Sequence, residues 1–224
     1  MPNVPTLSPP TIAISGSEQR FPVHRIYCVG RNYAEHAREM GNDPRESPFF
    51  FSKPADAVVG SGARLAFPSR TSDLHHEVEL VVALHKGGTN IAAADANAMI
   101  FGYAVGIDLT RRDLQAEAKK AGRPWDMAKG FDRSAPIGAL RVGVPPAAAA
   151  ISLSIDGELR QNGNLEDMIW SVAEIIAALS TFVELAPGDL IFTGTPAGVG
   201  AIRRGQTVRG MIAGIEPVEI TYQE

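Results

Sequence analysis

The stretch LHHEVELVVAL, residues 74–84, places two acids, Glu77 and Glu79, inside an apolar run. Alternate side chains of an extended strand share a face, so this spacing predicts that both carboxylates project the same way. Acids on a strand are most often solvated on the open face of a sheet. Residues 80–84 continue without polar alternation, however, which indicates a strand that is buried on both faces.

Two like charges in such a strand need a compensating partner, because burying an ionised carboxylate is costly. Asp108 ends a second apolar run, AVGID at residues 104–108, and adds a third carboxylate. Three oxygen ligands from two strands suit a hard divalent cation, Mg²⁺ or Mn²⁺, and leave about three of its six octahedral positions for water and substrate. We therefore expect Glu77, Glu79 and Asp108 to be metal ligands.

Composition limits the partners that we expect. The chain has 224 residues and a formal charge of −4, and it has no polybasic block, which argues against nucleic acid and against an anionic membrane surface. No apolar stretch approaches the ~20 residues of a membrane span, and the N-terminus lacks a signal pattern. The single cysteine, Cys28, lies in a buried-strand pattern and is interpreted as a core thiol. These features predict a cytoplasmic protein that acts on small molecules.

The order of the elements predicts a β-rich α+β fold rather than a doubly wound sheet. Residues 1–22 are rich in Pro and Ser and are expected to form an irregular arm, and residues 23–224 a single catalytic domain. We predict strands at residues 26–29, 49–51, 151–155, 190–193, 206–213 and 216–222. The sequence Asp156-Gly157 predicts a hairpin after the third of these strands. Residues 198–200, GVG, open no helix and are interpreted as a turn rather than a phosphate loop.

Three helices are indicated by their end signals. One covers about residues 33–40. A second runs from an N-cap at Thr110 to about Ala121, with Asp113 completing a capping arrangement, so that Asp113 has a structural role. The third begins with a capping box formed by Ser171 and Glu174.

His36 and Glu39 are three residues apart in the first predicted helix and share a face. Glu39 can therefore orient the His36 imidazole and stabilise its protonated form. The same spacing is also typical of a solvated surface pair. Lys129, in WDMAK at residues 125–129, is not distinguished by its local sequence.

Five motifs taken together resemble the fumarylacetoacetate hydrolase family. They are CVGRNY (28–33), HHEVE (75–79), GIDLT (106–110), WDMAK (125–129) and TGTPAGVG (193–200), in the family's order. Within the family the chain is similar to the short acylpyruvate hydrolases. RFPVH (20–24) and FFFSKPADA (49–57) resemble the bacterial fumarylpyruvate hydrolases of gentisate breakdown.

The resemblance implies a mixed β-sandwich roll, commonly a homodimer, and a role for each matched residue. Glu77, Glu79 and Asp108 match the magnesium ligands. His36 and Glu39 match a water-activating dyad on a mobile lid helix, and Lys129 matches the active-site lysine. The positions that match substrate contacts, or that offer a cation to a distal carboxylate, are Arg31, Lys53, Arg112, Gln115 and Thr195.

The function expected from these positions is metal-dependent hydrolysis of the carbon–carbon bond of an acylpyruvate, with fumarylpyruvate giving fumarate and pyruvate. Oxaloacetate decarboxylation and dienoate isomerisation remain alternatives, because each begins from a chelated 2-oxo acid and passes through an enolate. The dyad favours hydrolysis, since a decarboxylase needs no activated water. A non-catalytic binding protein would not need the full set of metal ligands, dyad and lysine.

Overall fold

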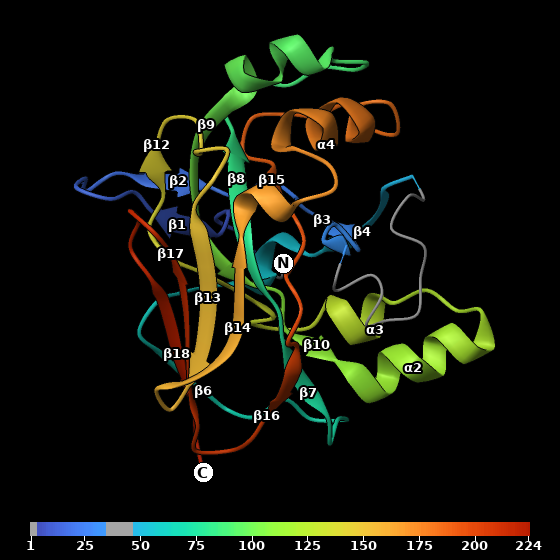
Figure 1. Cartoon of the computed structure of the whole chain (residues 1–224), viewed down its shortest axis with the longest axis vertical. Coiled ribbons are helices and arrows are strands. Elements are labelled where there is room, and N and C mark those ends of the chain that lie inside the picture. The colour runs from blue at the N-terminus through green and yellow to red at the C-terminus, as the bar shows by residue number, and fades with distance from the viewer. Residues whose placement is uncertain (1–3, 35–46) are drawn as a thin grey trace.

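The computed structural model describes residues 4–34 and 47–224, and four β-sheets dominate this part of the chain (Figure 1). The largest is an eight-stranded mixed sheet. Its strands are, in spatial order, β4 (Phe49–Lys53), β3 (Ile26–Gly30), β15 (Leu190–Phe192), β8 (Val78–Leu84), β9 (Ile100–Ile107), β11 (Ala135–Ile137) and β5 (Val58–Gly60), with β12 (Arg141–Val142) paired to β9. The predicted strand of residues 80–84 is thus at the centre of this sheet.

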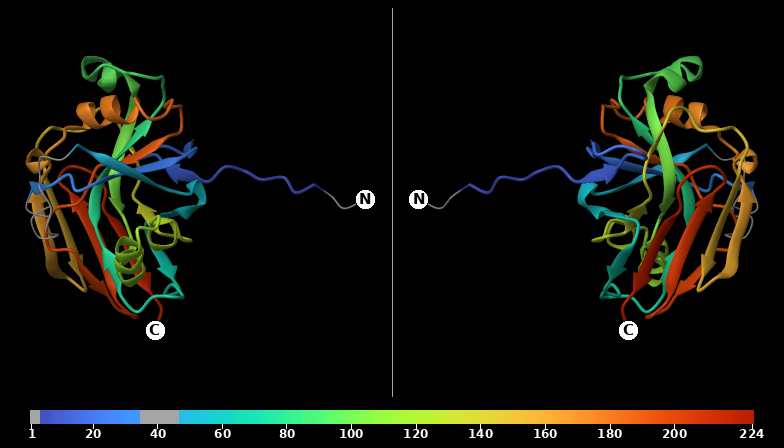
Figure 2. Two further views of the ribbon diagram at one scale, coloured as in Figure 1. Left: turned by 90° about the vertical axis from the view of Figure 1, so that its right-hand side faces the viewer. Right: turned by 90° about the vertical axis from the view of Figure 1, so that its left-hand side faces the viewer.

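Three smaller sheets complete the architecture. The five-stranded sheet forms a layer along one side of the molecule (Figure 2). It contains β14 (Glu158–Asn164), β13 (Ala150–Ile155), β17 (Thr207–Ile212), β18 (Val218–Tyr222) and β6 (Ala63–Leu65). The three-stranded sheet contains β10 (Thr110–Arg111), β7 (Leu74–His76) and β16 (Gly200–Ile202), and the two-stranded sheet β1 (Thr11–Ala13) and β2 (Arg20–Pro22). The predicted β-rich α+β class is confirmed.

The central strand β8 explains why its sequence does not alternate in polarity. Leu80, Val82 and Leu84 belong to the core cluster that reaches the five-stranded sheet. Val81 and Ala83, on the other face, belong to a second cluster that includes Cys28. Every residue of β8 is buried, as the sequence predicted. Glu79 shares the face of Val81 and Ala83, because alternate residues of a strand point the same way.

Helical segments cover the edges of these sheets. They are α2 (Arg112–Ala121), α3 (Asp126–Lys129) and α4 (Val172–Leu179), with the 3₁₀ turns η1 (Ala55–Ala57), η2 (Ala93–Met99) and η3 (Leu165–Asp167). Helices α2 and α3 contact each other, and α3 also contacts β10 and β4 (Figure 1). Helix α4 begins with the predicted Ser171–Glu174 capping box. The helix predicted over about residues 33–40 lies largely outside the described residues.

The predicted start of α2 was wrong. Thr110 belongs to strand β10, and the N-cap position is taken by Arg111 without a side-chain hydrogen bond. The Asp113 carboxylate instead accepts hydrogen bonds from the Thr71 hydroxyl at 2.7 Å and the Ser72 amide at 2.9 Å. Asp113 therefore has a structural role, as predicted, but it ties α2 to the loop before β7 instead of capping the helix.

The N-terminal arm is regular over part of its length. Residues 4–9 are exposed and extend away from the body of the protein (Figure 2). Strands β1 and β2, in contrast, pair antiparallel, and Ile12 and Phe21 are buried in the second core cluster. The expectation of an irregular arm over residues 1–22 was therefore wrong for this hairpin, because two apolar side chains anchor it to the larger sheet. No helix among the described residues has the length and apolar character needed to cross a bilayer.

Candidate metal centre and substrate pocket

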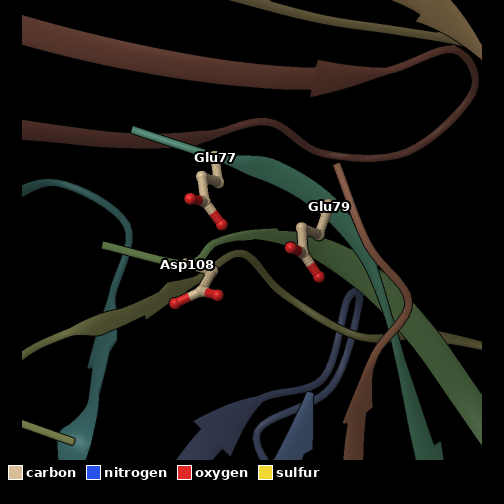
Figure 3. A group of neighbouring side chains, drawn as sticks. All are labelled: Glu77, Glu79 and Asp108. Atoms are coloured by element: carbon tan, nitrogen blue, oxygen red, sulfur yellow. The ribbon is translucent and has the colours of Figure 1, made fainter. Parts of the chain in front are cut away.

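Glu77, Glu79 and Asp108 converge at one end of the large sheet, and their side chains point toward one another (Figure 3). One carboxylate oxygen from each residue lies within 4.8 Å of the other two. The three residues expose only 5%, 2% and 1% of their surface, respectively. Three buried carboxylates at this separation form a cluster that can hold one divalent cation.

Strand pairing explains the convergence of the three acids. Strands β8 and β9 are antiparallel, with Val78 opposite Ile107 and Glu79 opposite Gly106. The amide of Asp108 donates a hydrogen bond to the carbonyl of Glu77 at 2.8 Å. One detail of the prediction was wrong, because Glu77 lies in a break between β7 and β8 rather than within one continuous strand with Glu79. The break does not separate the two carboxylates, and both still face Asp108.

Three cations surround the carboxylates. The Lys129 ammonium lies 2.9 Å from Glu77 Oε2 and 2.6 Å from Asp108 Oδ2. The Arg112 guanidinium forms an ion pair with Glu77 and also donates to Gln115 Oε1 at 2.6 Å. The Lys53 ammonium lies 2.8 Å from Asp108 Oδ1. The structure therefore brings Lys129, Arg112 and Gln115 together with the carboxylates, as the sequence comparison implied.

Lys53 has a different position from the one expected. It does not line the pocket beside the carboxylates, and its side chain is fully enclosed. Its ammonium donates to the carbonyl oxygens of Leu109 at 3.1 Å and Lys129 at 2.5 Å. The expectation that Lys53 contacts substrate is corrected, since these bonds hold it behind Asp108. There it ties β4 to the segments that carry Asp108 and Lys129.

The buried charges shift one another's pKa values. The pKa of Glu79 is raised well above its ordinary value, first by burial and then by the nearby charges of Asp108 and Glu77. Burial alone would lower the pKa of Lys129, but Asp108 and Glu77 outweigh burial and raise it. Lys129 is therefore a permanent cation at neutral pH. Glu79 is the carboxylate whose charge is least compensated by the protein.

One buried oxygen provides a test of whether a metal ion fits this cluster. Asp108 Oδ1 is buried and accepts no hydrogen bond from any described residue. The Lys53 ammonium lies 2.8 Å from this oxygen and compensates part of its charge, while two of its N–H groups donate to carbonyl oxygens. A buried carboxylate oxygen without a donor is unfavourable unless something else satisfies it. Three clustered carboxylates, one of which keeps an oxygen that accepts no hydrogen bond, form the kind of oxygen donor set that Mg²⁺ and Mn²⁺ prefer.

The loop after β15 supplies the opposite wall of the cluster. The amide of Gly194 donates to Glu79 Oε2 at 2.8 Å. Gly194 has a φ of +97°, and a Cβ there would lie 2.6 Å from the Cβ of Asn32. Only glycine allows this close approach without strain. The side-chain Nδ2 of Asn32 in turn donates to the carbonyl of Thr193 at 2.8 Å, so the segment leading to residue 34 is anchored beside the metal ligands.

Thr195 is buried and lines the pocket, as expected for a substrate contact. Its hydroxyl oxygen accepts a hydrogen bond from Gln161 Nε2 at 2.8 Å. The other end of that amide, Gln161 Oε1, accepts from the Val78 amide at 3.1 Å and lies 2.9 Å from His76 Nδ1. Burial lowers the pKa of His76, which favours the neutral ring donating to Gln161. Gln161 therefore holds Thr195 against the start of β8, a long-range link for which the sequence has no local signal.

Lys119 and Trp125 are among the residues of the pocket beside the carboxylates that the sequence analysis did not select. The lining residues include Gly30, Arg31, Phe49, Phe51, Glu77, Glu79, Arg112, Gln115, Lys119, Trp125, Lys129 and Thr195. Lys119 follows Arg112 and Gln115 at helical spacing on α2, and this spacing was a usable signal. His36 and Glu39 lie outside the described residues.

Three comparisons place this chain among known proteins. The family model for the fumarylacetoacetate hydrolase C-terminal domain matches residues 25–222. A fumarylpyruvate hydrolase from Ralstonia sp. is 44% identical over 79% of this chain and 93% of that protein. The mitochondrial oxaloacetate tautomerase FAHD1 of Mus musculus is 43% identical over 85% of this chain and 87% of that protein. A crystal structure of fumarylpyruvate hydrolase from Pseudomonas aeruginosa, in complex with Mn²⁺ and pyruvate, has a TM-score of 0.96 and 53% identity, and covers 98% of each chain.

The strand-rich fold and the carboxylate cluster agree with these matches over nearly the whole domain. The chain belongs to the fumarylacetoacetate hydrolase family. The relatives include both hydrolases and tautomerases at similar identity. Sequence identity by itself does not separate these two reactions.

Proposed function

We propose that this protein is a Mg²⁺- or Mn²⁺-dependent acylpyruvate hydrolase that converts fumarylpyruvate to fumarate and pyruvate. The observation that carries the proposal is the buried cluster of Glu77, Glu79 and Asp108 beside a pocket lined by cations. The similar crystal structure that contains Mn²⁺ and pyruvate supports the same chemistry. The three carboxylates would hold the ion, which when bound supplies Lewis-acid polarisation of the 2-oxo acid.

The protein's own residues then have distinct tasks. A water molecule gives a proton to the His36 imidazole, which Glu39 orients, and the water oxygen bonds to the distal carbonyl carbon. Lys129 remains protonated and stabilises the negative charge on that carbonyl oxygen. The carbon–carbon bond then breaks, its electron pair leaves with the pyruvate enolate, and a proton on the enolate carbon completes pyruvate.

The direction of the hydrogen bond to the Thr195 hydroxyl is defined in this scheme. Because its hydroxyl oxygen accepts from Gln161, its own hydroxyl hydrogen is available to donate to the carboxylate of the 2-oxo acid. Arg112 donates to Gln115 at the same wall of the pocket, and this contact supports the assignment of both residues to the same end of the substrate.

A second candidate, oxaloacetate keto–enol tautomerisation, is favoured by the tautomerases at 42–43% identity from Escherichia coli and mouse. This reaction moves one proton and uses no water as a nucleophile. Oxaloacetate decarboxylation and dienoate isomerisation stay as alternatives from the same chemistry.

The experiment that separates these functions is a substrate panel on purified protein with Mg²⁺, with Mn²⁺ and in excess chelator. We expect fumarylpyruvate to be cleaved in a metal-dependent way, with fumarate and pyruvate formed in equal amounts. Oxaloacetate assayed for loss of its enol form and for pyruvate release tests the tautomerase and the decarboxylase. Faster turnover of oxaloacetate than of any acylpyruvate, or full hydrolysis in chelator, would contradict the proposal.

We also propose that the protein is a cytoplasmic homodimer. The homodimer follows from the family resemblance, and the reducing compartment follows from a single buried cysteine. Sedimentation equilibrium of the purified chain measures the oligomeric state directly.

A further inference from the structure

The pocket contains a cation to which neither the metal cluster nor the expected substrate contacts assign a task. Lys119 lines the same pocket as Glu77, Glu79 and Lys129. It lies on α2, four residues after Gln115 and seven residues after Arg112. Residues at these spacings share one face of a helix. Lys119 therefore extends the substrate wall of the pocket by one helical turn beyond Gln115.

Three other basic residues around the carboxylates already have carboxylate partners. Arg112 pairs with Glu77, Lys129 pairs with Glu77 and Asp108, and Lys53 is enclosed behind Asp108. Lys119, in contrast, forms no ion pair with any acid of the described part of the chain. Its ammonium lies 5.1 Å from the centre of the Trp125 ring, which also contacts Phe49 edge to face.

Electrostatics at this position favour an anion. The pKa of Lys119 is lowered, first by partial burial and then by the neighbouring positive charges of Arg112 and Arg31. A group of like charges that lowers a lysine pKa is relieved when an anion enters among them. The Trp125 ring also shields one side of the ammonium, which strengthens its attraction for a carboxylate.

The spacing along α2 matches the length of a dicarboxylate substrate. Gln115 and Lys119 are separated by about 6 Å along the helix axis, given 1.5 Å of rise per residue. The two terminal carboxylates of an extended seven-carbon diacid lie about 7.5 Å apart, at the reach per bond of an extended chain. A substrate whose 2-oxo acid end lies beside Arg112 and Gln115 would therefore bring its other carboxylate to Lys119.

We propose that the Lys119 ammonium binds the distal carboxylate of the acyl group and thereby selects dicarboxylate acylpyruvates over acylpyruvates with an uncharged acyl group. This inference rests on the proposed hydrolase function, and it assigns the part of the pocket that decides which acyl group is accepted. Trp125 positions the lysine by holding its ammonium over the ring.

The test compares Lys119→Met with a matched control, Lys120→Met. Lys120 is the next residue of α2, is exposed and does not line the pocket. Binding is measured by calorimetry on Mn²⁺-loaded protein with two 2-oxo acids that the proposed reaction cannot cleave, because they have no second carbonyl. One is 2-oxoheptanedioate, which has a distal carboxylate, and the other is 2-oxoheptanoate, which has a methyl group there.

We expect wild type and Lys120→Met to prefer the dicarboxylate, and Lys119→Met to lose about 10–100-fold in affinity for it, as for one charge-assisted hydrogen bond. Affinity for 2-oxoheptanoate should change less than about twofold in both variants, and Lys119→Arg should keep most of the preference. Equal loss for both ligands, or no loss for either, would overturn the proposal.

Turnover then separates this inference from the function on which it rests. Relative to wild type, the ratio of kcat/KM for fumarylpyruvate to kcat/KM for acetylpyruvate should fall in Lys119→Met but not in Lys120→Met. An active wild type whose ratio is unchanged by Lys119→Met contradicts the lysine assignment alone. A wild type that binds the dicarboxylate through Lys119 but hydrolyses neither substrate contradicts the hydrolase function alone.

Discussion

At the scale of single residues, the protein compensates the negative charges of the three buried acids to different extents. Glu77 has two cationic partners, and Asp108 lies beside two lysines. Glu79 accepts a hydrogen bond from the Gly194 amide, and its pKa is raised because burial and two like charges disfavour its ionised form. A divalent cation compensates such a carboxylate directly, so Glu79 links metal binding to the stability of the fold.

The raised pKa of Glu79 predicts how pH changes the stability of the metal-free protein. A carboxyl whose pKa is higher in the folded than in the unfolded state binds more protons when folded, so stability falls as pH rises from its unfolded pKa toward its folded pKa. We expect the melting temperature of metal-free wild type to fall as pH rises above about 4.5. In Glu79→Gln this fall should be smaller, because the amide has no proton to lose and still accepts from Gly194.

Adding Mn²⁺ tests whether Glu79 is also a metal ligand. Mn²⁺ should raise the melting temperature of wild type at neutral pH, and Glu79→Gln should lower Mn²⁺ affinity by at least about tenfold. Glu18→Gln, in an exposed part of the N-terminal hairpin, is the control and should behave as wild type. An unchanged Mn²⁺ affinity in Glu79→Gln would remove Glu79 from the ligand set.

At the scale of elements, one buried amide joins three segments that are distant in the sequence. Gln161 of β14 contacts His76 and Val78 at the start of β8, and Thr195 in the loop after β15. It also donates to the carbonyl of Pro196 at 2.9 Å. All four hydrogen-bonding positions of the amide are thereby used, which determines its orientation.

This arrangement predicts a large effect for a substitution far from the metal in sequence. Gln161→Leu leaves several buried polar groups without a partner, and we expect the free energy of unfolding to fall by about 2–4 kcal/mol. The KM for a 2-oxo acid should also rise, because Thr195 loses its orientation. Urea denaturation and steady-state kinetics measure the two effects, with exposed Gln223→Leu as the control. Stability within about 0.5 kcal/mol of wild type would contradict a linking role.

The elements also show which parts of the structure the sequence predicts. The apolar run of residues 80–84 identified a central strand, because burial on both faces removes polar alternation. The Ser171–Glu174 capping box is a local signal and marked the start of α4 correctly. Thr110 misled the helix prediction, because its pairing opposite His75 in β10 outweighs its N-cap preference. The break at Glu77 has no hydropathy signal and was missed.

At the scale of the whole molecule, the pocket combines residues from both halves of the chain. The metal ligands lie at the paired ends of β8 and β9, the cations Arg112, Lys119 and Lys129 come from α2 and α3, and Thr195 comes from the loop after β15. The sequence predicted the metal ligands because acids within apolar runs are unusual. Lys119 was recoverable from helical spacing, whereas Gln161 was not, because only the packing of the five-stranded sheet against the large sheet brings it to Thr195.

The central claim is that this site adds water to an acylpyruvate, and oxygen-18-labelled water tests it most directly. Wild-type protein with Mn²⁺ and fumarylpyruvate should place one labelled oxygen in the carboxylate of fumarate formed at the cleaved bond, with the label in unreacted substrate measured as the control. His36→Ala should slow this incorporation by about 10²–10⁴-fold, as for loss of one general base. Cleavage without solvent label in fumarate, or no cleavage of any acylpyruvate, would contradict the claim.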